Sequence, residues 1–290
     1  MPQRESLSPI LARNLLVAGE LQRLVRAFES ARIPFVVLKG LPLLKRVYGR
    51  LDARPVTDND LLVRASDVEA GLEILEGLGY RRVPPGALET FMGAEFHTCL
   101  VREHPKGWRA LCDLHWTVFH PHLYPVREDL LWSRTEEYDL QTCRVQVFDP
   151  AMTILHLASH YAQHRFEQPR ILQDLAAAWN RWASEVDDLE AIAPEAGLDH
   201  TVDFALSVTD DLGLLLVPPP RIGSRRARRL RRLIRKDALA RGVGGPAALR
   251  RLLPLVLADP GNVAQWFSSV VLHPRAAGAR LRSRFAHTRR

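Results

Sequence analysis

Two short apolar runs, each next to charged residues, constrain the fold of this chain more than any other feature of its sequence. The first run spans residues 35–38 and leads into Lys39-Gly40; the second spans residues 61–63 and follows Asp58-Asn59-Asp60. Because side chains alternate along a strand, Asp58 and Asp60 share one face. Two such carboxylates repel each other at neutral pH, so the pair is typical of a position facing water or a divalent cation.

The residues around these runs predict helices and strands in alternation up to residue 149. Residues 8–31 read as a helix with Ser8 as N-cap and Pro9 at its first position. Its expected buried stripe is Leu11, Leu15, Ala18, Leu21, Val25 and Phe28. Further helices are expected over residues 41–47 and from about 67 to 78. Further strands are expected over residues 97–101, 110–118 and 144–148.

The strand expected over residues 110–118 carries a third carboxylate. Asp113 and His115 share one face of this strand, while Cys112, Leu114 and Trp116 share the other. The turn-like residues 104–107 connect this strand to the one before it. Leu111 and Thr117 also belong to the face of Asp113, so the third carboxylate stands on a strand among apolar neighbours.

From residue 150 onward the pattern becomes helical. Helices are expected over residues 151–164, 169–184, 187–196, 199–212, 224–239, 246–257 and 261–272. The predicted organisation is therefore a core domain with an N-terminal helix over residues 1–149, an all-helical domain over 150–272, and a basic, flexible tail over 273–290.

Charge is unevenly distributed along the chain. Residues 221–290 contain 18 Lys and Arg against 2 Asp and Glu, a net charge of +16, whereas residues 1–220 contain 22 against 31, a net charge of −9. Residues 221–236 hold nine basic side chains and no acidic one. This stretch is either a solvated helix face or a surface that binds RNA or another polyanion.

Composition excludes several other classes of protein. The three cysteines have no Cys-x-x-Cys spacing, so we expect reduced thiols and neither a disulfide framework nor a zinc ribbon. No run of 18 apolar residues and no secretory signal pattern occurs, so no transmembrane segment is expected and the predicted location is the cytoplasm. The sequence does not specify the oligomeric state.

The order of these features resembles a known family. A Lys39-Gly40 turn follows a buried strand, and Arg54 precedes Asp58-x-Asp60. An amphipathic helix then ends in Leu78-Gly79-Tyr80, and the run Asp113-Leu114-His115-Trp116 comes after it. Together with His156-x-x-x-His160 and Asp174-Leu175, this order resembles the uncharacterised bacterial nucleotidyltransferase family of the polymerase-β-like superfamily, over roughly residues 10–180.

The resemblance implies an α+β fold, in which a small mixed sheet with flanking helices forms the nucleotidyltransferase core. It also implies a magnesium-dependent enzyme, with Asp58, Asp60 and Asp113 as catalytic metal ligands for Mg²⁺ or Mn²⁺. Three carboxylates on neighbouring strands can bind two such ions, one neutralising the triphosphate and one activating the acceptor hydroxyl. On this interpretation Asp113 is nearest the nucleophile and is the candidate general base.

The same resemblance suggests how an NTP, ATP among them, would be held. Lys39 would place a positive charge on the phosphates, and Gly40 would let the backbone approach them. Arg54 would orient the carboxylates or a phosphate, or it is an ordinary loop arginine. His115, His156 and His160 are possible substrate-lining residues, although helical histidines spaced four apart are more often interface or capping residues.

The expected reaction is transfer of an NMP from an NTP to an acceptor hydroxyl with release of pyrophosphate. The acceptor would be a small molecule, a peptide natural product or an RNA end. One alternative is a non-catalytic module of the same fold that binds RNA or another polyanion through its basic C-terminal region. The other is a metal-dependent phosphotransferase that acts like a kinase.

Overall fold

The structure is a computed structural model that describes residues 8–84, 96–105, 107–119, 123–124, 126–164, 166, 168–220, 222 and 263. The predicted helices over residues 224–239, 246–257 and 261–272, the basic stretch 221–236 and the tail 273–290 lie outside this description, except for residues 222 and 263. None of the helices described is both long and apolar enough to cross a membrane.

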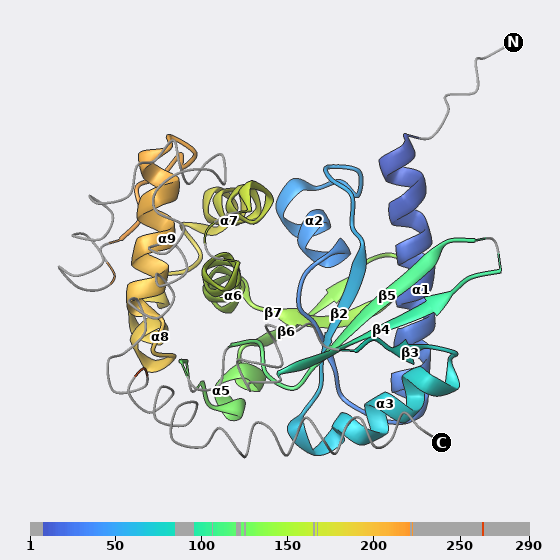
Figure 1. Cartoon of the computed structure of the whole chain (residues 1–290). Coiled ribbons are helices and arrows are strands. Elements are labelled where there is room, and N and C mark those ends of the chain that lie inside the picture. Colours follow the sequence, from blue (N-terminus) through green and yellow to red (C-terminus); the bar gives the residue numbers. More distant parts are fainter. Residues whose placement is uncertain are drawn as a thin grey trace, which may run out of the picture. The chain divides into compact units, whose positions relative to one another are not determined.

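The chain divides into two compact units. The first contains Met1–Pro84, His97–Val118 and Glu128–Asp149, and the second contains Pro85–Phe96, Phe119–Arg127 and Pro150–Arg290. The first unit holds the sheet and the second holds the later helices (Figure 1). The predicted domain ranges extend into residues outside the description and stay predictions.

Among the described residues of the first unit, seven strands form one mixed sheet in the order β3-β4-β5-β2-β1-β7-β6. The strands are β1 (Val36–Val37), β2 (Asp58–Leu62), β3 (Arg81–Arg82), β4 (His97–Glu103), β5 (Arg109–His115), β6 (Thr135–Asp139) and β7 (Arg144–Phe148). The pairs β2–β5 and β1–β7 are parallel, whereas the other neighbours are antiparallel.

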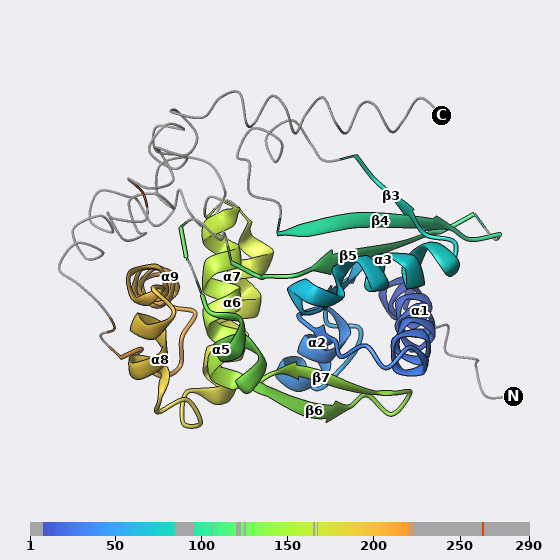
Figure 2. The same ribbon diagram turned by 90° about the horizontal axis from the view of Figure 1, so that it is seen from below.

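Helices accompany the sheet in the first unit. They are α1 (Pro9–Ser30), α2 (Leu41–Tyr48), α3 (Val68–Gly77), which the 3₁₀ turn η1 (Ala65–Asp67) precedes, and α5 (Glu128–Ser133). Apolar side chains of α1 and α3 form one core with Leu61, Cys112 and Leu114, so these two helices cover one face of the sheet (Figure 2). The opposite face of the central strands is then left for Asp60 and its polar neighbours.

The second unit contains α6 (Pro150–Gln163), α7 (Pro169–Trp182), α8 (Leu189–Glu195) and α9 (Asp199–Asp211). Helix α6 contacts both α7 and α9, and α8 contacts α9. The interior includes aromatic side chains in edge contact, with Phe166 lying between Tyr161 and Phe204. A mixed sheet with flanking helices, followed by helices alone, confirms the predicted α+β fold class over the part of the chain described.

Helix α1 begins as predicted, but its buried stripe differs from the prediction. Ser8 caps the helix, and its hydroxyl accepts a hydrogen bond of 3.0 Å from the Leu11 amide. Leu15 is 44% exposed, whereas Asn14 and Glu20 are buried. An amphipathic pattern assigns leucine to the core and polar residues to the surface. The prediction fails at these positions because the buried polar side chains make specific hydrogen bonds.

Asn14 explains part of this difference because it fastens the loop that leads into β2. Its side-chain amide donates hydrogen bonds to the carbonyl oxygens of Leu51 and Arg54, and its carbonyl oxygen accepts one of 2.8 Å from the Val56 amide. These three bonds satisfy polar groups of a loop without regular structure. The start of β2, and with it Asp58, is thereby held against α1.

Candidate active site

The two parallel strands β2 and β5 bring the predicted carboxylates together. In their register, Asp60 lies opposite Asp113 and Asp58 lies opposite Leu111. Residues that lie opposite each other on paired strands project from the same face. Asp60 is 1% exposed, and Asp58 and Asp113 are both partly buried. Negative charges therefore gather on the sheet face that α1 and α3 do not cover.

Lys39 supplies a positive charge to this group. Its Nζ lies 3.3 Å from Oδ1 of Asp60 and 3.7 Å from Oδ2 of Asp58. Burial alone would lower the pKa of this ammonium group, but the charges of Asp60, Asp58 and Asp113 outweigh burial and raise the pKa. Lys39 therefore remains protonated at neutral pH and acts as a counter-ion to two of the carboxylates.

Gly40 follows Lys39 in a conformation that favours glycine. Its φ is +76°, and a Cβ at this position would lie 3.4 Å from Cγ1 of Val56 and 3.6 Å from the Asp58 carbonyl oxygen. Gly40 is also the N-cap of α2, where the first backbone amides of a helix have no partner within it. Leu41, the first residue of α2, is 2% exposed and belongs to the core. The turn thus places the first backbone amides of α2 directly after Lys39 in the chain.

Asp113 differs chemically from an ordinary surface aspartate. Burial, reinforced by the nearby charge of Asp60, raises its pKa to about 6, although a hydrogen bond from Cys99 and the proximity of His115 oppose the rise. A carboxylate with this pKa is mostly ionised at neutral pH and is a stronger base than a free aspartate. These properties suit the general-base role that the sequence predicts, which stays a prediction.

His115 also belongs to this face. Its Nε2 lies 3.3 Å from Oδ1 of Asp60, and its ring stacks on the ring of His97 with centroids 4.9 Å apart. One ligand atom each from Asp60, Asp113 and His115 lies within 4.8 Å of the others, a grouping that can hold a metal ion. Carboxylate oxygens are the ligands that Mg²⁺ prefers, so Asp60 and Asp113 fit the predicted ion.

The remaining predicted ligand, Asp58, has a different surrounding. Its Oδ1 accepts a hydrogen bond of 2.9 Å from the Thr57 hydroxyl, and its Oδ2 faces Lys39. Asp58 is not part of the compact group formed by Asp60, Asp113 and His115. To join a shared ion it would exchange its ion pair with Lys39 for a metal contact, and its role as a ligand stays a prediction.

The other predicted site residues belong to the loop before β2 and to α6. Arg54 is in the loop before β2, where its guanidinium donates a hydrogen bond of 3.2 Å to the Pro55 carbonyl oxygen. His156 and His160 lie on α6 in the second unit with their rings stacked at 5.9 Å, and His160 contacts His164 at 3.0 Å between Nε2 atoms. The substrate-binding roles assigned to Arg54, His156 and His160 stay predictions.

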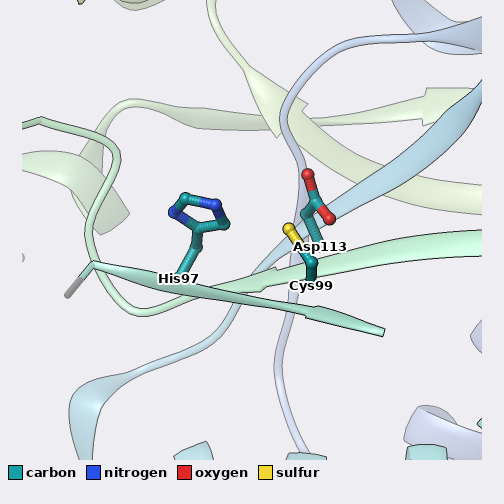
Figure 3. A group of neighbouring side chains, drawn as sticks. All are labelled: His97, Cys99 and Asp113. Carbon is teal, nitrogen blue, oxygen red and sulfur yellow. The ribbon is translucent and has the colours of Figure 1, made fainter. Parts of the chain in front are cut away.

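Two side chains that the sequence analysis did not select belong to the same sheet face. Strand β4 pairs with β5 so that His97 lies opposite His115 and Cys99 lies opposite Asp113. In Figure 3, His97, Cys99 and Asp113 project from the same side of these strands. The alternation His97-x-Cys99 within the predicted strand was a signal that these two side chains share a face, but the predicted turn over residues 104–107 did not assign them to the face of Asp113. None of the three cysteines forms a disulfide, as predicted.

Comparison with known proteins identifies the family. Residues 4–213 match the family described as uncharacterised nucleotidyltransferase. The chain belongs to this family. Among solved structures, a match is an antigenic nucleotidyltransferase-like protein from Paracoccidioides brasiliensis, with 14% sequence identity and a TM-score of 0.38; the match covers 64% of this chain and 91% of that chain. A comparison with curated proteins found no match.

Proposed function

We propose that this nucleotidyltransferase family member transfers an NMP from an NTP to an acceptor hydroxyl and releases pyrophosphate, with Mg²⁺ or Mn²⁺ as cofactor. The observation that carries the proposal is the pairing of Asp60 with Asp113 across β2 and β5, with Lys39 within 3.3 Å of Asp60. This site combines acidic metal ligands, the ammonium group of Lys39 and an ionised base, which are the groups that phosphoryl-transfer chemistry requires.

Each group has a distinct task in this proposal. Asp58, Asp60 and Asp113 would hold the divalent ion, which when bound neutralises phosphate charge and lowers the pKa of the acceptor hydroxyl. The acceptor oxygen forms a bond to the α-phosphorus while the bond from that phosphorus to the bridging oxygen breaks, and pyrophosphate leaves. Asp113 accepts the hydroxyl proton, because its pKa of about 6 makes it a stronger base than a free aspartate.

Lys39 and Gly40 would bind the triphosphate. With a divalent ion on Asp58 and Asp60, the ammonium group of Lys39 would lose its attraction to them and turn to phosphate oxygens. The left-handed conformation of Gly40 lets the backbone approach the same oxygens, and the amides of Leu41 and Leu43 at the start of α2 would donate to them, whereas Pro42 between them has no amide proton. Leu41 is buried in the core, so phosphate binding would depend on these backbone donors and on Lys39 rather than on a side-chain hydroxyl.

The direct test uses the whole chain and α-labelled ATP, CTP, GTP and UTP with Mg²⁺. Candidate acceptors are a small-molecule mixture, a peptide mixture and RNA with a free 3′ end. We expect label to move from one or more NTPs to an acceptor, and the acceptor to gain the mass of an NMP. A gain of one phosphate would instead identify a phosphotransferase. RNA binding that falls steeply with salt, with no transfer and no NTP binding, would favour a binding module.

Lys39→Met tests two roles of this lysine separately: its ion pairs with Asp58 and Asp60, and its proposed contact with the phosphates of the NTP. Removing the ammonium group leaves Asp58 and Asp60 without their counter-ion, so we expect Mn²⁺ to bind at least about threefold more tightly in the absence of nucleotide. With nucleotide present, loss of a phosphate contact should weaken NTP binding about tenfold, the effect of one charged hydrogen bond. Electron paramagnetic resonance measures free Mn²⁺, and calorimetry measures NTP binding.

Lys45→Met is the matched control for this substitution. Lys45 lies in the last turn of α2, where its Nζ contacts the Gly49 carbonyl oxygen at 3.3 Å. This change removes the same charge from the same helix region without touching a carboxylate of the site. Equal effects of the two substitutions on Mn²⁺ and NTP binding would contradict the role given to Lys39.

A further inference from the structure

A second set of metal-ligand side chains lies on the strand pair β4–β5, beside the carboxylates. The antiparallel register places His97 opposite His115 and Cys99 opposite Asp113. Because residues two apart along a strand share a face, two imidazoles, a thiol and a carboxylate lie on one patch. One ligand atom each from His97, Cys99 and Asp113 lies within 4.8 Å of the others, and Figure 3 shows the three side chains on the same side of the strands.

We propose that His97, Cys99 and Asp113 bind a borderline divalent metal ion such as Zn²⁺, at a site that shares Asp113 with the proposed Mg²⁺ site and adds an imidazole and a thiol to it. Bonds of 2.0–2.3 Å around tetrahedral Zn²⁺ place neighbouring ligand atoms about 3.3–3.7 Å apart. The observed spread of up to 4.8 Å therefore needs closure by about 1 Å, and both His97 and Cys99 are only partly buried. Small side-chain rotations can supply such a movement.

The ligand types determine which ion this site would select. A thiolate and an imidazole favour Zn²⁺ or Co²⁺, whereas Mg²⁺ favours oxygen ligands and keeps much of its water. Three protein ligands leave a fourth position of the tetrahedron for water or for a substrate atom. The patch as a whole would thus hold a hard ion on Asp60 and a softer ion on Cys99, with Asp113 available to both.

Two observations make this patch more than a chance cluster. The ligands come from adjacent strands in regular register, so the backbone positions them without a mobile loop. The stacked ring of His115 covers one side of the His97 ring and limits its orientation. A preorganised set of ligands loses less conformational freedom when an ion binds. The inference does not require nucleotidyl transfer, because binding of a softer ion can be measured with no nucleotide present.

Cobalt absorption tests the proposal on the purified, metal-free full chain. We expect one Co²⁺ to bind per chain with a near-ultraviolet charge-transfer band from thiolate to cobalt, and Zn²⁺ to abolish that band by displacement. Cys99→Ser should remove the band. His97→Ala should weaken Co²⁺ binding by at least about tenfold, the lower end of what even outer ligand contacts contribute.

Two control variants separate this site from the rest of the chain. Cys143→Ser should keep the band, because Cys143 is partly buried against the hydrophobic core rather than on the polar face. Asp58→Asn should also keep it while altering the proposed Mg²⁺ site, so failure of nucleotidyl transfer and failure of this proposal give different results. A full-strength band in Cys99→Ser, or no band in the parent chain, would overturn the proposal.

Thiol alkylation provides a second measurement that needs no variant to fold. In the parent chain, Zn²⁺ should slow alkylation of Cys99 at least about tenfold and leave Cys143 unchanged, as read by peptide mass spectrometry. Equal alkylation rates of Cys99 with and without Zn²⁺ would refute the site.

Discussion

Replacement of Asp60 with Asn is expected to reduce nucleotidyl transfer by at least about a thousandfold. Asp60 is 1% exposed, lies opposite Asp113 and contacts both Lys39 and His115. An amide of the same size keeps the shape but removes the charge that would hold a divalent ion, and such an ion contributes several kcal/mol to the transition state. Since each 1.36 kcal/mol changes a rate tenfold, a loss of about 4 kcal/mol corresponds to this factor.

The measurement is the initial rate of label transfer from the NTP that supports the reaction, at saturating Mg²⁺. Glu73→Gln is the matched control, because this side chain lies exposed on α3 and its charge is lost in the same way. Circular dichroism and thermal melting establish that both variants are folded. An Asp60→Asn variant that is folded and transfers the nucleotide at the parental rate would exclude the proposed site.

Loss of Asp60 also has an expected effect on Asp113. The charge of Asp60 is the second-largest cause, after burial, of the raised pKa of Asp113. Removing that charge lowers the pKa of Asp113, so this carboxylate becomes a weaker base. Any residual activity of the variant should therefore fall less as the pH decreases toward 6 than the activity of the parent chain does.

Much of the fold could be predicted because local signals coincided. The run Phe35–Leu38 is bounded by Pro34 and Gly40, and the carboxylate pattern marks β2. By contrast, β3, β6 and α5 were missed. The strand β3 is two exposed arginines, and three of the five residues of β6 are acidic, so neither strand has the apolar alternation that identifies a strand. These segments form strands because a neighbouring strand offers hydrogen bonds at the edge of the sheet.

The candidate site was predictable only to the level of single strands. Alternation places Asp58 with Asp60 and Asp113 with His115, since residues two apart share a face. No short turn connects β2 to β5, so the register that sets Asp60 opposite Asp113 could not be read from the sequence. The predicted turn over residues 104–107 would pair Cys99 with Cys112, on the apolar face. The observed connection between Glu103 and Arg109 is one residue longer, and this difference sets Cys99 opposite Asp113.

Buried polar contacts between segments far apart in the sequence could not be predicted from sequence patterns. Glu20 is buried on α1, where Oε1 accepts hydrogen bonds of 2.9 Å from the Tyr80 hydroxyl and 3.1 Å from Nε of Arg102. A second Arg102 nitrogen contacts the other carboxylate oxygen. Tyr80 ends the Leu78-Gly79-Tyr80 motif. Through the Glu20 carboxylate, this motif connects the end of α3 to α1 and β4.

Replacement of Glu20 with Ala is expected to lower the free energy of unfolding by about 3–5 kcal/mol, the range for removing one partner of a buried ion pair. The substitution leaves the Arg102 guanidinium and the Tyr80 hydroxyl without their shared acceptor in a largely buried place. Urea denaturation followed by tryptophan fluorescence measures the change. Glu29→Ala is the control, since this side chain is exposed on the same helix and its removal should cost little.

The double variant Glu20→Leu, Arg102→Met distinguishes the ion pair from simple packing. Well-packed apolar residues in place of a buried ion pair are often neutral or stabilising, so the double variant should recover most of the stability that Glu20→Leu loses. Additive losses would mean that Glu20 and Arg102 stabilise the chain independently, which their contact geometry does not predict. Because β4 also carries His97 and Cys99, a destabilised β4 in Glu20→Ala should weaken Co²⁺ binding as well, and recovery in the double variant should restore it.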